Sequence, residues 1–537
     1  MQTSFIPLSE THQFPSLILD YLKGEKSLAS FYKYAPEINF FEQAIADKSK
    51  EKIDRTTLVD VLKEQNRISE KRFPLVFQNI ESLKNENTFT VSTGHQLCLF
   101  TGPLYFIYKI ISTINLAEEL KKRFPDKHFV PVYWMASEDH DFEEINHIHL
   151  FGKTLKWENA ENSGIPVGEI KTDSLKNYLE ELKKIMGESE NANYLVQLFS
   201  DAYLKNNNLA EATKYLVSEL FGTYGLVVID AADKRLKKCF SDILKDDILN
   251  NTNFHLVQNA IEKLAKQNIS AIVNPREINC FYVTEKVRGR IIFENGKYQI
   301  QHTELVFSEK EILEELENYP EKFSPNVVLR CLYQEKILPN LAYIGGPGEI
   351  SYWFQYKEMF EHHQINFPVL MLRNSVLWLD SVISEKIKSL KIDFEKLFFS
   401  EEELVKDFVK NNSETEVNLE VETNELKKIF LALSDKAANI DGSLKPLVEA
   451  EMQKTINALK NIENRFLKAE KQKQEVTINR LRKIKSTLFP EKKMQERYDN
   501  FIPYYLKNGK HFIETLKESL HPFDSRLIVI SEHSENK

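Results

Sequence analysis

The chain has 537 residues, of which 42% are hydrophobic and 28% charged, a composition typical of a globular protein of two to four domains. Its formal net charge of −9 argues against a dedicated nucleic-acid-binding protein, and no apolar window reaches the roughly 20 residues that a membrane helix needs. The N-terminus does not resemble a signal peptide and the four cysteines form no CxxC pair, so we expect a cytoplasmic protein with no nucleic-acid partner and no membrane contact.

A repeated unit predicts a mostly parallel β-sheet. The unit is a short apolar run followed by a Gly- or acid-rich turn and then a helical pattern. Its apolar runs lie at residues 88–92, 130–135, 226–229, 340–344 and 369–372. Two stretches interrupt this alternation: 152–209, which is mixed and polar, and 280–300, which alternates around a hairpin signal at Asn295-Gly296. We therefore predict an α/β core over residues 1–384 with insertions at about 152–209 and 280–300.

The sequence changes character at about residue 385, where charged residues dominate and apolar residues fall three and four apart. One helix is predicted over 426–440, and the turn 441–443 ends it. A second helix, with Pro446 in its first turn, continues to Leu488 and would be about 60 Å long at 1.5 Å per residue. A helix of this length cannot pack wholly against its own domain. We therefore predict an antiparallel coiled coil over 385–490 through which two chains form a homodimer. Residues 491–537 would then return to the core.

Ligands of such a sheet bind outside the carboxyl ends of its strands. The polar and glycine residues after the first strand are Thr93, Gly94, His95, Gln96, Thr101, Gly102, Tyr105 and Lys109. Glycine lets the backbone approach a ligand closely, and a helix N-terminus attracts phosphate. The alternative is a tight turn with buried tyrosines.

An acidic run, Glu138, Asp139, His140 and Asp141, follows the second strand. Three acids around one histidine are costly unless they face solvent, a cation or a substrate amine. The run fits a general base or an amine-binding anion, a metal site, or a solvated turn. Because HExxH or a comparable ligand spacing is absent, we predict catalytic residues here, together with His95, and no metal ligand.

Further candidates follow the later strands. Asp230 suits a ribose hydroxyl, an amine or a plain helix cap. The turn containing Gly345, Gly346, Gly348 and Glu349, with Tyr352 beyond it, predicts backbone N–H groups around an anion, with a structural bend as the alternative. Arginines beside apolar runs bind either a ligand or an acid; those that could reach a ligand are Arg276, Arg330 and Arg373. Where the long helix ends, Gln495, Arg497 and Tyr498 could clamp a phosphate and stack on a base, or form an interdomain salt bridge.

Four runs carry a resemblance to a known family. STGHQLCLFTGPLYFIYKIIS at 92–112 resembles the TG-Q-LFTGPLY-I-K signature of the bacillithiol cysteine-adding enzymes (BshC). Three further runs are similar to that family's later signatures: VYWMASEDHDFEEINHI at 132–148, YIGGPGEISYW at 343–353, and LFPEKKMQERYDNFIPYYLKNGKHFI at 488–513. The resemblance implies a Rossmann-like core of the nucleotidylyltransferase type, two connecting insertions and a coiled coil that mediates homodimers. It also implies a reaction that joins cysteine to the amine of glucosaminyl malate.

Three classes of function remain open. A ligase must activate the cysteine carboxylate, because amide formation from a free acid is uphill in water. ATP (or ADP) is therefore expected as a cosubstrate, with no tightly bound cofactor. We expect this activation at the 93–102 turn and expect the acidic run to receive the amine. The alternatives are a nucleotide-binding hydrolase or nucleotidyltransferase acting on another small substrate, and a non-catalytic coiled-coil assembly protein.

Overall fold

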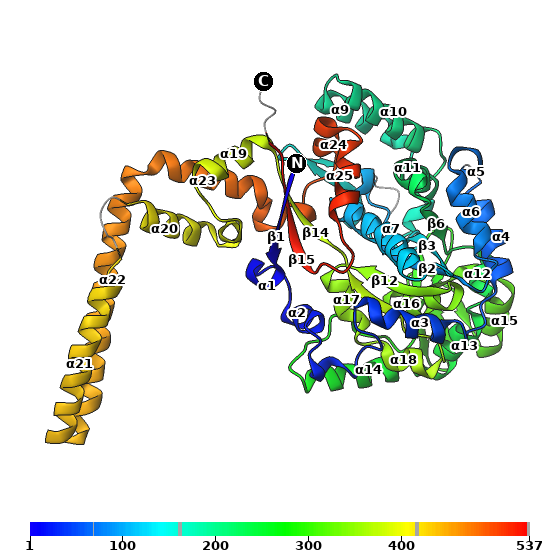
Figure 1. Cartoon of the computed structure of the whole chain (residues 1–537). Coiled ribbons are helices and arrows are strands. Elements are labelled where there is room, and N and C mark those ends of the chain that lie inside the picture. Colours follow the sequence, from blue (N-terminus) through cyan, green and yellow to red (C-terminus); the bar gives the residue numbers. More distant parts are fainter. Residues whose placement is uncertain (68, 159–163, 414–417, 534–537) are drawn as a thin grey trace.

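The computed structural model describes the chain except residues 68, 159–163, 414–417 and 534–537. An α/β body carries a long helical arm that projects from one side (Figure 1). The first and last strands, β1 (Gln2–Pro7) and β15 (Arg526–Ser531), pair antiparallel with each other near the base of the arm. None of the helices in the described part of the chain is both long enough and apolar enough to cross a membrane.

The body is built around a five-stranded parallel sheet with the order β13-β12-β2-β3-β6. Its strands are β2 (Thr88–His95), β3 (His128–Met135), β6 (Val227–Asp230), β12 (Asn340–Gly345) and β13 (Val369–Leu372). All four strand pairs are parallel. The five predicted strands and the parallel, Rossmann-like sheet are therefore confirmed.

Helices cover both faces of this sheet, which explains why its strands are apolar on both sides. On one face Val132 and Trp134 pack against α4 (Arg55–Gln65) and α16 (Val327–Ile337). On the other face Tyr133 and Met135 pack against α7 (Tyr105–Arg123) and α11 (Leu209–Phe221). The carboxyl ends of β2, β3 and β12 lie side by side, so the residues after these strands share one edge of the sheet.

Two insertions extend the body. The first lies between β3 and β6 and contains β4 (His147–Leu150), β5 (Lys153–Lys156), α9 (Lys176–Met186) and α10 (Glu190–Leu204). The second lies between β6 and β12 and forms an antiparallel sheet with the order β10-β9-β8-β7-β11. The predicted hairpin joins β8 (Arg288–Glu294) to β9 (Lys297–Ile300). Asn295 and Gly296 both have positive φ, 52° and 75°, as a two-residue type I′ turn requires.

A third sheet, which the sequence did not reveal, connects the body to the arm. β14 (Ser375–Leu379) pairs parallel with β15, and β15 pairs with β1. Val376 and Trp378 face the core of the body. On the opposite face, Leu377 and Leu379 pack against Ile484 and Leu488, which lie in the helix that follows the arm. β14 escaped detection because only two residues separate it from β13.

The arm is the predicted antiparallel helical hairpin, formed by α21 (Glu420–Ile440) and α22 (Lys445–Lys473) (Figure 1). The prediction of one continuous helix to Leu488 is wrong, because α22 ends at Lys473 and α23 (Glu475–Leu488) starts after Gln474, whose ψ is 17°. Helix α20 (Glu401–Asn412) packs where the direction changes. Its Val405 and Val409 contact Leu467 of α22 and Ile478 of α23, so the break lets both helices cover one apolar face of α20.

Candidate active site

A cavity of about 720 Å³ opens at the carboxyl edge of the parallel sheet. Residues after β2, β3 and β12 form much of its wall, and the second insertion and the C-terminal segment complete it. The arginines in this wall are Arg276, Arg288, Arg290, Arg330, Arg373 and Arg497. A concave site of this volume at the strand ends has the size and position of a small-molecule site.

A buried ion pair, Lys109 with Glu349, joins the ends of two strands at this cavity. Lys109 Nζ lies 2.7 Å from Glu349 Oε2 and donates to the carbonyl oxygen of Gly94 at 2.5 Å. Glu349 also accepts hydrogen bonds from Tyr343 Oη at 2.7 Å and from the Gly346 N–H at 2.8 Å. The Lys109 side chain is 3% exposed and that of Glu349 is 27% exposed. The pair therefore links α7, the end of β2 and the start of α17 (Pro347–Trp353).

This pair sets the protonation of its surroundings. Burial alone would raise the pKa of Glu349, but the charge of Lys109 and the hydrogen bonds lower that pKa to about 2. Burial, followed by the charge of Lys109, lowers the pKa of His95 to about 4. The His95 ring is therefore neutral at neutral pH. Its Nδ1 lies 2.8 Å from the carbonyl oxygen of Gln96, so Nδ1 carries the proton and Nε2 is an acceptor.

Two carboxylates share one amide on the acidic side of the cavity. Gln96 Nε2 donates to Asp139 Oδ2 at 2.8 Å and to Glu144 Oε2 at 2.7 Å. The backbone N–H of His140 donates to the other Asp139 oxygen at 2.8 Å. Neither Asp139 nor Glu144 is paired with a lysine or arginine among the residues that the structure describes. These are the carboxylates best placed to receive a substrate cation.

Glu138 is engaged differently from Asp139. Both of its carboxylate oxygens lie 2.7 Å from Nζ of the fully buried Lys237, which also donates to the Phe323 carbonyl. His140 and Asp141 do not line the cavity. His140 Nδ1 accepts from Arg288 Nη1 at 2.9 Å, and burial together with the Arg288 charge lowers the pKa of His140. Asp141 is exposed and directly precedes α8 (Phe142–Ile145).

The second half of the 93–102 turn lies outside the cavity wall. Phe100, Thr101 and Gly102 have φ values of 48°, 74° and 66°, in the left-handed region. Asn500, fully buried, donates through Nδ2 to the carbonyl oxygens of Phe100 at 2.9 Å and Gly102 at 2.6 Å. A Cβ at Gly102 would lie 2.5 Å from Cys98 Cβ. Thr101 and Gly102 thus belong to a joint between the start of α7 and the C-terminal segment.

The remaining predicted residues also divide into those that line the cavity and those that lie behind its wall. Gly94, Gln96, Tyr105, Gly346, Gly348 and Tyr352 line the cavity. Thr93 and Gly345 lie within the strand ends behind it, where Thr93 Oγ1 donates to the Ile344 carbonyl at 2.8 Å. Of the three C-terminal candidates, Arg497 lines the cavity. Gln495 exchanges two hydrogen bonds with the backbone of Trp378, and Tyr498 stacks on His149 with ring centroids 3.9 Å apart.

Arg373, also in the cavity wall, forms a buried pair with Glu496. Its Nη2 lies 2.7 Å from Glu496 Oε1, and the two side chains are 2% and 1% exposed. Burial would lower the pKa of Arg373, but Glu496 raises it above the ordinary value. In contrast, the guanidinium groups of Arg276, Arg290 and Arg497 have no hydrogen-bonding or ion-pairing partner in the described part of the chain. Three positive charges at the cavity are thus available to an anion.

Sequence reasoning missed several residues of the wall. Arg288 and Arg290 come from β8 of the second insertion, and Glu144 from α8. The signal that could have found the two arginines is their spacing of two in a strand, which places them on one face. Arg288 stacks over the Phe281 ring at 3.9 Å. Its Nε donates to Ser324 Oγ at 3.0 Å.

Comparison with known proteins places these features in a family. The model "Bacillithiol biosynthesis BshC, N-terminal Rossmann-like domain" matches residues 1–374, and "Bacillithiol biosynthesis BshC, C-terminal coiled-coil domain" matches residues 376–532. Curated relatives named "Putative cysteine ligase BshC" include one from Flavobacterium psychrophilum, 44% identical, and one from Christiangramia forsetii, 40% identical; each alignment covers 99% of both chains. A relative of the same name from Bacillus anthracis is 28% identical over 94% of this chain and 95% of its own.

Breaking the ion pair at the cavity should destabilise the fold in a pH-dependent way. Lys109→Met leaves Glu349 without its cation, and we expect it to lower the free energy of unfolding by about 2–4 kcal/mol at pH 7. The pKa of Glu349 falls from its usual 4.5 to about 2 on folding, so the contribution of its charge is complete above about pH 4.5 and disappears as the pH falls toward 2. Glu349→Gln removes this charge. Thermal unfolding of the wild type and Glu349→Gln between pH 7 and pH 3 therefore measures how the stabilisation by the Glu349 charge depends on pH.

The matched control is Glu309→Gln, which changes an exposed carboxylate in the first turn of α15 (Glu309–Asn318). Glu309→Gln should follow the wild-type pH dependence, whereas the gap between the wild type and Glu349→Gln should narrow on acidification. A gap that stays constant over this range would contradict the assignment of the buried charge.

Proposed function

The chain belongs to the BshC family, and from that premise we propose that it is a cysteine ligase that joins cysteine to the amine of glucosaminyl malate in the last step of bacillithiol biosynthesis. ATP (or ADP) serves as the nucleotide cosubstrate. One observation supports this most strongly: the same cavity is lined by guanidinium groups that have no partner, and by carboxylates that have no lysine or arginine partner, among the described residues. The reaction needs both, because its nucleotide is anionic and its amine substrate is largely an ammonium near neutral pH.

The proposed chemistry has two steps. A carboxylate oxygen of cysteine attacks the α-phosphorus of ATP, and pyrophosphate leaves. The amine nitrogen of glucosaminyl malate then attacks the carbonyl carbon of the mixed anhydride, and AMP leaves as the amide forms. The proton lost by the amine passes to a carboxylate at the cavity, in the role of general base.

Asp139 is the residue that we assign to this proton transfer. Gln96 and the His140 N–H hold its two oxygens in place, so the carboxylate is oriented before substrate binds. Arg276, Arg290 and Arg497 would neutralise the phosphates and the charge that develops on them. Glu138 takes no proton in this scheme, because Lys237 already pairs with both of its oxygens.

The state of the cysteines supports a cytoplasmic location for the proposed reaction. All four cysteines are free in the structure, and three of them are buried. Free thiols are typical of a reducing compartment. We therefore assign the reaction to the cytoplasm.

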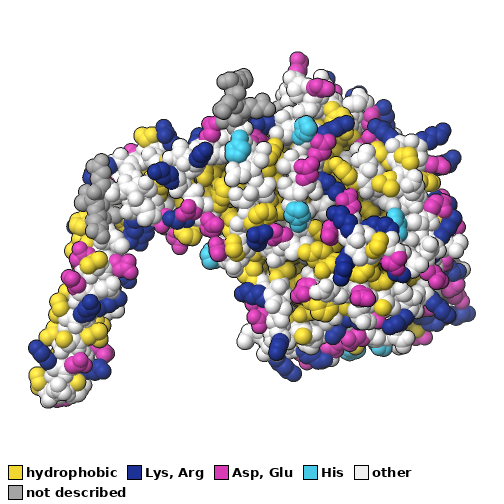
Figure 2. Space-filling model, viewed as in Figure 1, with side chains coloured by type: hydrophobic (Ala, Val, Ile, Leu, Met, Phe, Trp, Pro, Cys, Tyr) yellow, Lys and Arg dark blue, Asp and Glu magenta, His cyan; other side chains and the backbone are white. Residues whose placement is uncertain are grey.

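The structure of the arm supports a homodimer as the working form. Apolar side chains along the α21–α22 hairpin are exposed, and Figure 2 shows them beside charged groups on the projecting arm. Ile429, Leu433 and Ile440 are 55%, 44% and 79% exposed and are spaced by four and seven residues on one face of α21. Such a stripe on a coiled coil is suited to a second copy of the same hairpin.

The general-base assignment is tested by Asp139→Asn. This change keeps the size of the side chain but removes its basicity, so we expect amide formation to slow by about 10²- to 10⁴-fold. Mass spectrometry of the product from glucosaminyl malate, cysteine and ATP measures the rate. Asp141→Asn, two residues away and outside the cavity, is the control and should retain wild-type turnover. Equal rates for the two variants would refute the assignment.

The nucleotide site is tested by Arg497→Ala. Loss of a charge-assisted hydrogen bond to phosphate should weaken ATP and ADP binding by about 10- to 100-fold in isothermal titration calorimetry. Lys493→Ala removes an exposed charge four residues earlier that lies outside the cavity, and it should bind nucleotide as the wild type does. Unchanged affinity in Arg497→Ala would show that Arg497 does not contact the nucleotide.

The dimer is tested by the triple variant Ile429→Lys, Leu433→Lys and Ile440→Lys. Light scattering should give about twice the 62.8 kDa of one chain for the wild type and a single-chain mass for the variant. Val382→Lys, which charges a residue 55% exposed on α19 (Ser381–Ser389), should remain dimeric. If the folded triple variant is also dimeric, the interface lies on another surface.

A further inference from the structure

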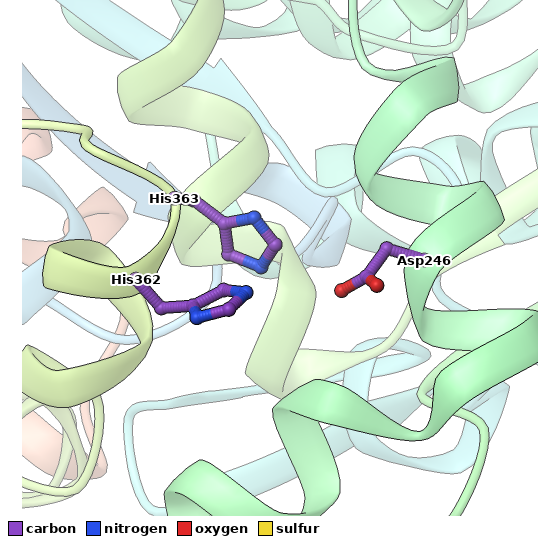
Figure 3. A group of neighbouring side chains, drawn as sticks. All are labelled: Asp246, His362 and His363. Atoms are coloured by element: carbon purple, nitrogen blue, oxygen red, sulfur yellow. The ribbon is translucent and has the colours of Figure 1, made fainter.

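Three potential metal ligands come together outside the cavity, between the middle of one helix and the end of another. Asp246 lies on α13 (Ser241–Asn250), His362 is the last residue of α18 (Lys357–His362), and His363 follows it. One ligand atom from each lies within 4.8 Å of the other two. Figure 3 shows the three side chains converging on the same space, Asp246 from one side and the two imidazoles from the other.

The Asp246 carboxylate is held with one oxygen unused. Asn250 Nδ2 donates to Asp246 Oδ1 at 2.8 Å. Asp246 Oδ2 is buried and has no hydrogen-bond partner in the described part of the chain. A buried carboxylate oxygen without a partner is costly, and a cation beside it removes that cost.

The His363 ring is oriented as a metal ligand would be. Its Nε2 lies 2.9 Å from Asn253 Oδ1. Asn253 Nδ2 in turn donates to Asp247 Oδ1 at 3.1 Å, which fixes the amide so that its oxygen faces the imidazole. Nε2 must therefore carry the ring proton, and the lone pair of Nδ1 accepts no hydrogen bond from the residues that the structure describes. A carboxylate or amide oxygen on the far nitrogen is the usual outer support of a metal-binding histidine.

We propose that Asp246, His362 and His363 bind a divalent transition-metal ion of the zinc type. Two imidazoles and one carboxylate are a ligand set that zinc accepts, with water in the fourth position, whereas Mg²⁺ and Ca²⁺ prefer all-oxygen sites. Tetrahedral ligands at about 2.0–2.1 Å from zinc lie about 3.4 Å apart. The set must therefore contract by roughly 1 Å from its present spread. The His362 side chain can make this movement because it is exposed and carries no hydrogen bond among the described residues.

The proposed site is connected to the cavity wall through buried polar groups. Asp247, which holds Asn253, also accepts from the Asn279 backbone N–H at 2.6 Å. Asn279 Oδ1 then accepts from the backbone N–H of Arg276 at 2.9 Å and from Asn326 Nδ2 at 3.1 Å. Arg276 and Asn326 line the cavity. The ion would therefore fasten α18 to α13 and brace the segment that carries Arg276, a structural role separate from the chemistry.

The test is zinc binding by the full-length, tag-free protein after treatment with a chelator. Titration calorimetry with Zn²⁺ should give one site per chain in the wild type, and His362→Ala should lower its affinity by at least about tenfold. Asp246→Asn, which keeps the shape of the side chain, should do the same. His255→Ala changes an exposed histidine on the neighbouring α14 (Thr252–Ala265) and should bind zinc as the wild type does.

Substitution with Co²⁺ supplies a spectroscopic check, because a four-coordinate site with imidazole ligands gives visible absorption that should be lost in His362→Ala. Absence of zinc binding in the wild type would overturn the proposal. Undiminished binding by folded His362→Ala would overturn it equally, because the ion would then be held elsewhere. Neither result depends on the ligase assay, so the two proposals succeed or fail separately.

Discussion

The cavity depends on one buried ion pair, Lys109 with Glu349. Desolvation of two charges is expensive and is offset only when the remaining hydrogen-bonding positions are filled. Here Lys109 also donates a hydrogen bond to the Gly94 carbonyl, and Glu349 also accepts hydrogen bonds from Tyr343 and the Gly346 N–H. The pair thereby fixes the ends of β2 and β12 relative to each other. A Cβ at position 94 would lie 3.3 Å from Arg330 Nη1, so a larger residue there would require this guanidinium group to shift by a few tenths of an ångström.

The other charges of the cavity follow the same logic. Two buried cations beside the cavity each have an acid of their own: Lys237 with Glu138 and Arg373 with Glu496. These pairs neutralise themselves and shape the wall. The buried Arg288 instead donates to His140, Ser324 and the Pro325 carbonyl. Among the residues that the structure describes, the exposed guanidinium groups of Arg276, Arg290 and Arg497 have no ion-pair partner, and the Asp139 and Glu144 carboxylates have no lysine or arginine partner. A site organised in this way suits a reaction between an anion and an ammonium, which is the chemistry that we propose for it.

The local βα pattern allowed the parallel strands, the Asn295-Gly296 hairpin and the helical arm to be predicted, because each depends on residues close in sequence. The same pattern placed His95, Asp139 and Glu349 at one edge of the sheet. It could not separate residues that face the cavity from those that hold the turn behind it. Thr101 and Gly102 share a motif with Gln96. However, hydrogen bonds from Asn500, about 400 residues later, to the carbonyls of Phe100 and Gly102 hold this part of the turn against the C-terminal segment. Arg290 was missed for a related reason, since only the folded insertion brings β8 to the cavity.

The connection between arm and body keeps the cavity separate from the projecting hairpin. Leu488 ends α23 against the third sheet, and Arg497 lines the cavity nine residues later. Between them, Gln495 bonds to the backbone of Trp378 in β14, and Glu496 is buried against Arg373. These two contacts fasten Arg497 to the body and not to the arm. Bending of the hairpin therefore need not displace the guanidinium group.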